Sequence, residues 1–263
     1  MRLLVSAASA IDAAAALEGG ADIVDAKDPA RGALGPVSAD TLRAIVATVA
    51  GQRPVTAALG DACEPAALEA HARTFAAGGA TLVKVGFDGV TDLRLAQSLA
   101  ESAVRGARGG NPAAHVVLVA YADTPALAMS PATLLEVAST TGAAGVLLDT
   151  ADKSGPRLTE LVSPTWLTNW VAAAHRRSLL VALAGRLRAE DLPIVRRCGA
   201  DVAGVRGAAC TGGRRGVVEA ARVRALLDAC GDHNQRGRRV RENLASQRLR
   251  ADTGSCTRQP PSG

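Results

Sequence analysis

The sequence predicts an α/β fold, a single (β/α)8 TIM barrel over residues 1–230 followed by a disordered basic C-terminal tail over residues 231–263. Three observations predict it. Eight short apolar runs alternate with eight amphipathic stretches, which is the pattern of a closed barrel. The apolar runs show almost no polar alternation, as expected of parallel strands buried on both faces. With 263 residues, 48% of them hydrophobic, the chain has enough apolar surface to bury a sizeable core.

The strands are predicted from runs rich in valine, leucine and isoleucine. In chain order they cover residues 2–6, 22–27, 54–59, 81–86, 115–121, 145–149, 179–184 and 201–205. The helices are predicted from stretches rich in alanine, leucine and arginine, one after each strand. They cover residues 9–19, 38–50, 64–78, 91–107, 130–141, 164–177, 188–197 and 218–230.

Residues typical of helix ends support several of these boundaries. Hydroxyl side chains suited to an N-cap stand at four starts: Ser38, Thr91, Ser130 and Ser163. Glycines suited to a C-cap stand at or just after four ends: Gly19, Gly78, Gly142 and Gly199. An open doubly wound sheet is the alternative fold. Its glycine-rich dinucleotide loop is missing from the first strand–helix turn, where residues 6–9 read Ser-Ala-Ala-Ser.

Charge and composition narrow the range of partners. The net charge is +5, and residues 231–263 are rich in arginine, which is typical of a solvated tail. Aromatic residues are only 2% of the chain, which leaves little for stacking on bases, so we do not expect a nucleic-acid partner. No apolar run approaches a membrane span. The sequence leaves the oligomeric state open, a homo-oligomer included.

The cysteines indicate the compartment. Their number is odd, at five, and they show no Cys-x-x-Cys spacing. This pattern favours reduced thiols and a cytoplasmic protein, and no metal site is expected.

Lysine is scarce, and its placement indicates chemistry. Lys27, Lys84 and Lys153 are the three lysines of the chain, against 27 arginines, and each lies in or just after a predicted strand. Lysine can lose its proton and attack a carbonyl, which arginine cannot do. The alternative interpretation is that all three are ordinary salt-bridge lysines on solvated edges.

Carboxylates accompany these lysines at the C-terminal ends of the predicted strands, where barrels carry their active sites. Asp25 and Lys27 are two residues apart and share a strand face. Asp149 ends another strand shortly before Lys153. A buried lysine close to other cations has a lowered pKa, as a Schiff-base nucleophile requires. We therefore predict Lys27, Lys84, Asp25, Asp149 and Lys153 as catalytic residues.

Small residues and arginines follow the last two strands, where many barrels bind phosphate. Gly185 and Arg186 follow the seventh strand, and Arg206 and Gly207 follow the eighth. A third glycine-rich loop follows Lys27 and contains Arg31. We expect this loop to cover the mouth of the barrel, or to hold a second phosphate through Arg31. The alternative is that these loops are tight turns with solvated arginines.

The chain resembles the (5-formylfuran-3-yl)methyl phosphate synthases from residue 3 to about residue 230. The matching segments are residues 3–6, 19–27, 32–35, 84–86, 120–123, 148–151, 182–185 and 204–210. The resemblance implies a cytosolic lyase with a (β/α)8 fold and with neither a metal nor an organic cofactor. The reaction it implies joins two molecules of glyceraldehyde 3-phosphate into a furan aldehyde phosphate for methanofuran-type C1 carriers, losing phosphate and water. It also implies that Lys27 forms the Schiff base and that Lys84 accepts a proton.

Two other functions remain open at this stage. One is a different lysine-dependent aldolase acting on small sugar phosphates. The other is a non-catalytic adaptor that binds through its basic tail; such a protein would have no use for buried lysine–aspartate pairs.

Overall fold

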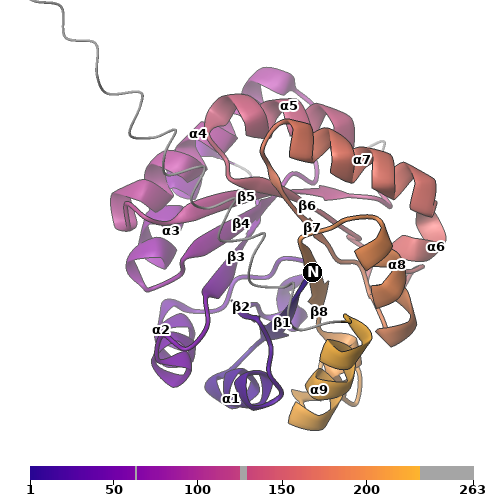
Figure 1. Ribbon diagram of the computed structural model, residues 1–263. Coiled ribbons are helices and arrows are strands. Elements are labelled where there is room, and N and C mark those ends of the chain that lie inside the picture. The colour runs from indigo at the N-terminus through magenta and orange to yellow at the C-terminus, as the bar shows by residue number, and fades with distance from the viewer. Residues whose placement is uncertain (63, 125–128, 232–263) are drawn as a thin grey trace, which may run out of the picture. The chain divides into compact units, whose positions relative to one another are not determined.

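A closed barrel of eight parallel strands is the centre of the computed structural model, which describes residues 1–62, 64–124 and 129–231 (Figure 1). The strands are β1 (Arg2–Ala7), β2 (Ile23–Ala26), β3 (Val55–Asp61), β4 (Leu82–Gly86), β5 (His115–Tyr121), β6 (Gly145–Asp149), β7 (Leu180–Leu183) and β8 (Val202–Val205). Each strand pairs with the next, and β8 pairs with β1 in parallel. This closure confirms the predicted barrel and excludes the open sheet.

Helices surround the barrel (Figure 1). They are α1 (Ala10–Glu18), α2 (Ala39–Val49), α3 (Pro65–Ala77), α4 (Leu93–Gly110), α5 (Pro131–Thr141), α6 (Leu158–Leu161), α7 (Pro164–Arg176), α8 (Leu192–Arg197) and α9 (Ala220–Ala229). None of the helices in the described ranges combines the length and apolar character needed to cross a bilayer.

Most predicted helix ends are confirmed. Ser38, Ser130 and Ser163 cap α2, α5 and α7, each hydroxyl accepting a hydrogen bond from a backbone N–H three residues later. At α4 the prediction of Thr91 is wrong by one residue. Asp92 is the N-cap, and its carboxylate accepts from Leu95 N at 2.7 Å. A carboxylate is favoured there because it also interacts well with the helix dipole.

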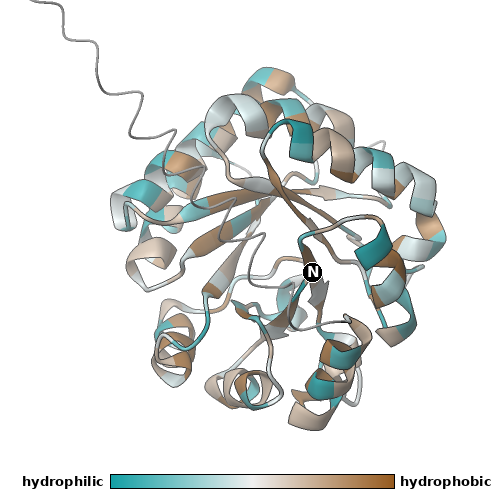
Figure 2. Cartoon of the chain, in the orientation of Figure 1, coloured by the Kyte–Doolittle hydropathy of each residue, from teal (hydrophilic) through white to brown (hydrophobic). Residues whose placement is uncertain are grey.

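The core has two layers, as expected for strands buried on both faces. One cluster, which includes Leu4, Val119 and Leu147, fills the barrel interior. A larger cluster, with Leu3, Leu118 and Leu148 one position away on the same strands, packs between barrel and helices. Figure 2 shows this as apolar strands at the centre and hydrophilic residues mainly on the helices.

Short elements that the sequence analysis did not predict lie mainly in the loops at the C-terminal ends of strands. They are the helix α6, the 3-10 turns η1 (Pro29–Arg31) and η3 (Gly207–Ala209), and a two-stranded sheet of β9 (Cys210–Thr211) and β10 (Val217–Val218). The helix predicted over residues 188–197 starts instead with a 3-10 turn, η2 (Ala189–Asp191), and α8 follows it. Cys198 and Cys210 are buried free thiols, and Cys230 is buried as well. The predicted basic tail lies outside the described residues from 232 onward.

Candidate active site

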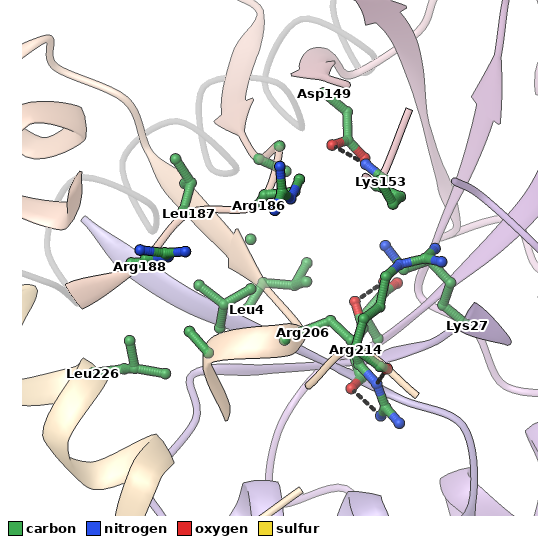
Figure 3. Close-up of a pocket in the computed structure, with 18 of the residues that line it drawn as sticks. Leu4, Lys27, Asp149, Lys153, Arg186, Leu187, Arg188, Arg206, Arg214 and Leu226 are labelled. Atoms are coloured by element: carbon green, nitrogen blue, oxygen red, sulfur yellow. Dashed lines mark hydrogen bonds and ion pairs between the residues drawn. The ribbon is translucent and has the colours of Figure 1, made fainter. Parts of the chain in front are cut away.

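The C-terminal ends of the strands surround a cavity of about 580 Å³. Its lining includes nine of the ten residues predicted from the sequence: Asp25, Lys27, Lys84, Asp149, Lys153, Gly185, Arg186, Arg206 and Gly207. Figure 3 shows the cavity with Lys27, Asp149 and Lys153 on one side and Arg188 and Leu226 on the other. The predicted catalytic residues therefore share one space with the predicted phosphate loops.

Asp25 is the buried centre of a hydrogen-bond network at the end of β2. Its carboxylate accepts from Thr56 Oγ1 at 2.6 Å and from Ser6 Oγ at 3.1 Å. These donors come from the residues paired with Asp25 on the two neighbouring strands. Lys84 Nζ lies 2.6 Å from Asp25 Oδ2, and both side chains are buried. Burial raises the pKa of Asp25, but the charges of Lys84 and Lys27 outweigh burial and leave the pKa below its ordinary value.

A second ion pair closes the opposite wall. Lys153 Nζ lies 2.6 Å from Asp149 Oδ1 and also donates to the carbonyl oxygen of Thr150. Burial raises the pKa of Asp149, but the charges of Lys153 and Lys27 outweigh burial. The pKa therefore lies below its ordinary value, and the carboxyl is ionised. The loop is anchored by Asp123, whose two carboxylate oxygens accept from Ala151 N and Asp152 N at 2.7 and 2.8 Å.

Lys27 lies between these two ion pairs and differs from both other lysines. Only 8% of the residue is exposed. Within the described part of the chain, its side chain forms no ion pair or hydrogen bond. Burial lowers the pKa of Lys27 to about 8, since the attraction of Asp149 and Asp25 does not compensate for burial and for the repulsion of Lys153 and Lys84.

This environment favours the unprotonated form of the Lys27 amine. An amine with a pKa near 8 is about 10% unprotonated at pH 7, roughly 300 times more than an ordinary lysine. The free amine can attack a carbonyl, and the neighbouring ionised groups can take or return protons.

The loops after β7 and β8 offer an anion-binding surface at the same cavity. None of the loop and turn hydrogen bonds between backbone groups of residues 1–62, 64–124 and 129–231 is donated by the N–H of Gly185, Arg186, Gly207 or Ala208. Gly185 and Arg186 both have positive φ values, 102° and 58°, a conformation that favours glycine at the first position. Free N–H groups next to an arginine are a common way to hold phosphate.

Arg206 has a different environment from the one expected for phosphate binding. Its guanidinium is buried and donates to Ser6 O, Asp12 Oδ2, Gly216 O and Arg214 O, at 2.8, 2.7, 2.8 and 3.1 Å. These contacts occupy the side chain in holding loops together, and the geometry does not favour a direct phosphate contact.

Arg31 is the predicted residue that the structure does not bring to the site. It is exposed and absent from the cavity lining, and its Nη1 donates to Pro36 O at 3.0 Å within its own loop.

Comparison with known proteins agrees with this geometry. A family model described as 4-HFC-P synthase matches residues 3–227. The chain belongs to this family. It is 38% identical to the (5-formylfuran-3-yl)methyl phosphate synthase of Methanopyrus kandleri, over 87% of this chain and 98% of the relative. It is 36% identical to the enzyme of the same name from Methanocaldococcus jannaschii, over 88% of this chain and 100% of the relative.

Solved structures show the fold that this 4-HFC-P synthase family member shares more widely. A 3-hexulose-6-phosphate synthase superimposes with a TM-score of 0.57 at 24% identity, covering 88% of this chain and 100% of that one. A KGPDC from Streptococcus mutans gives 0.61 at 14% identity, covering 87% and 96%.

A hydrogen bond between the ends of β3 and β5 depends on a glycine of β4 in this family member. Tyr121 Oη donates to Asp61 Oδ1 at 2.6 Å, across the end of β4. A Cβ atom on Gly86 would lie 1.9 Å from Asp61 Oδ1 and 2.6 Å from Tyr121 Oη, so a side chain there would displace the pair. Burial, together with Asp61, raises the pKa of Tyr121, which keeps the phenol protonated as the donor.

Sequence reasoning missed the residues that support the site. Ser6 and Thr56 bind Asp25, Asp12 holds Arg206, and Arg214 lines the cavity. Ser6 and Thr56 carried a detectable signal, since polar residues are rare inside these apolar strands. Their contact with Asp25 depends on strand register, which the sequence does not specify.

Proposed function

We propose that this protein forms (5-formylfuran-3-yl)methyl phosphate from two molecules of glyceraldehyde 3-phosphate, with Lys27 as the Schiff-base nucleophile. The observation that carries the proposal is the buried amine of Lys27, which has no ion-pair partner in the described structure and a pKa lowered to about 8. The names of the relatives support the product.

The chemistry balances without an oxidant or reductant. The amine of Lys27 adds to the carbonyl carbon of one triose, and loss of water gives the imine. The imine makes the adjacent C–H acidic, and Lys84 or a carboxylate accepts that proton. Condensation with the second triose and ring closure release one phosphate and two water molecules in total, and hydrolysis of the imine restores the lysine.

The two ion pairs have distinct roles in this proposal. Lys84 accepts a substrate proton after it has passed its own ammonium proton to Asp25, and Lys153 with Asp149 acts on the opposite wall. The free N–H groups after β7 and β8, together with Arg186, bind a substrate phosphate. Supply of a methanofuran-type C1 carrier is the pathway role that this product suggests.

The test is incubation with glyceraldehyde 3-phosphate alone. The proposal expects a furan aldehyde chromophore in the ultraviolet and release of inorganic phosphate. Reduction with borohydride during turnover, followed by peptide mass spectrometry, should place the adduct on Lys27. An aldolase acting on other sugar phosphates would give neither chromophore nor phosphate, and an adduct on another lysine would refute the assignment.

A further inference from the structure

The loop that follows Lys27 forms part of the cavity wall. It runs over residues 28–35 and is closed by a hydrogen bond of 2.8 Å from Asp28 N to Gly35 O. Ala30 N donates to Asp28 Oδ1 at 2.9 Å, which fixes the first turn. Leu34 is buried and lines the cavity. Because the loop starts at the residue after Lys27, its position determines where the backbone of Lys27 leaves the barrel.

Arg214 binds this loop from the other end of the chain. Its Nη1 donates to Pro29 O and its Nη2 to Gly32 O, both at 2.6 Å. The guanidinium thus joins the loop after β8 to the loop after β2, and it is half-buried at the cavity (Figure 3). Two acceptors on different residues match the fixed fork of an arginine, whereas a lysine ammonium is a single point charge.

The backbone of Arg214 is itself held by Arg206. Arg206 donates to the carbonyl oxygens of Arg214 and Gly216, and its Nη1 is paired with the buried carboxylate of Asp12. Asp12 also accepts from Val218 N at 3.0 Å. Arg206 therefore links the barrel to Arg214, and Arg214 links this assembly to the 28–35 loop. The links are charged hydrogen bonds, which are stronger than neutral ones.

We propose that Arg214 is a positioning residue for Lys27: it holds the 28–35 loop in place and so keeps the amine of Lys27 directed into the cavity. The inference rests on the proposed role of Lys27. The effect of the two Arg214 hydrogen bonds on the loop, which we call the latch, can nevertheless be tested without turnover. Asp25, Lys84, Asp149 and Lys153 are the charged groups that act most strongly on Lys27, and Arg186, Arg206 and Arg214 line the same cavity. Because Arg214 is itself a cation, Arg214→Lys, which keeps the charge, separates loss of the loop contacts from loss of charge.

The latch has a measurable consequence. If the loop is released, water reaches Lys27 and the largest cause of its lowered pKa is weakened. The pKa then rises toward the ordinary value of 10.5. Each unit of rise reduces the free amine at pH 7 about tenfold.

The experiment is competitive acylation of the full-length protein at a series of pH values, with peptide mass spectrometry of the three lysines. The variants are Arg214→Gln and Arg214→Lys, and the matched control is its exposed neighbour, Arg215→Gln. We expect Lys27 to titrate about one unit higher in Arg214→Gln, with a smaller rise in Arg214→Lys. In Arg215→Gln it should titrate as in the unmodified protein.

Folding is checked by circular dichroism and thermal unfolding. An unchanged Lys27 titration in folded Arg214→Gln overturns the proposal. If Arg214→Gln does not fold, Arg214→Lys decides in the same way, since an ammonium lacks the fixed fork of two nitrogens with which the guanidinium reaches both carbonyls. Borohydride adducts on a different lysine would refute the proposed function, yet the acylation titration would still report on the latch.

Discussion

The ammonium group of Lys84 lies 2.6 Å from Oδ2 of Asp25, while Lys27, two residues after Asp25 in the chain, makes no such contact in the described structure. The second carboxylate, Asp149, is paired with Lys153 in the same way. Three amines thus share a cavity with two paired carboxylates. Lys27 is the one of the three without an ion pair among the described residues, and its lowered pKa supports its proposed role as the nucleophile.

Adduct formation should depend on pH through this amine. With limiting substrate and cyanoborohydride, we expect the trapping rate to rise with pH up to about 8 and then to level off, because the free-amine fraction follows the pKa of Lys27. The measurement is the initial rate of adduct formation by mass spectrometry. A rate that keeps rising tenfold per unit up to pH 10 would mean that the amine is not perturbed.

Lys27→Arg should abolish trapping and turnover together. A guanidinium retains the positive charge but does not deprotonate, so no imine can form. Lost furan absorbance and lost adduct are the two readouts. Residual turnover at the level of the unmodified protein would show that position 27 is not the nucleophile.

Lys84→Arg should separate imine formation from the later steps. Arginine keeps a cation beside Asp25, so trapping at Lys27 should continue, while product formation slows by about 10²- to 10⁴-fold because a proton acceptor is lost. Rapid-quench measurement of adduct and product distinguishes the two effects. Equal loss of both would contradict the division of roles between Lys27 and Lys84.

Lys27→Met should stabilise the protein while inactivating it. Burial disfavours the ammonium, and its removal should raise the free energy of unfolding by about 1–3 kcal/mol at pH 7. Because the pKa is lower in the folded than in the unfolded state, the unmodified protein gains stability between about pH 8 and pH 10.5. The difference between the two proteins should therefore shrink over that window in urea unfolding, and a constant difference would refute this account.

Asp25→Asn should destabilise the fold, because it leaves the buried ammonium of Lys84 without its carboxylate. The expected cost is about 3–5 kcal/mol, against about 1 kcal/mol for Thr56→Val, which removes one hydrogen bond to the same carboxylate. Urea unfolding of both variants makes the comparison. Equal costs would mean that the ion pair contributes little.

The sequence predicted the barrel well because its signals are local. Alternating apolar and amphipathic stretches and hydroxyl or glycine caps depend on nearby residues, and the same holds for the placement of Lys27, Lys84 and Lys153 at strand ends. The position of α4 was off by one at its start because threonine and aspartate both suit an N-cap.

The contacts that distinguish the site residues were beyond the sequence. Arg206 and Arg31 were grouped with Arg186 by residue type and by neighbouring glycines. Only the fold shows that Arg206 donates a hydrogen bond to Asp12 and that Arg31 donates one to Pro36 O. Both contacts depend on loop conformation, and that between Arg206 and Asp12 joins opposite ends of the chain.

The pairing of β8 with β1 has a consequence for how the protein is made. Lys27 and Lys84 are synthesised early. The closed barrel that excludes water from them is complete only when the last strand, β8, has been synthesised. In an unfinished chain Lys27 is hydrated, and the burial that lowers its pKa is missing. If Lys27 acts as proposed, a partly synthesised chain should therefore react poorly with aldehydes, and the reactive amine should form only once β8 has paired with β1.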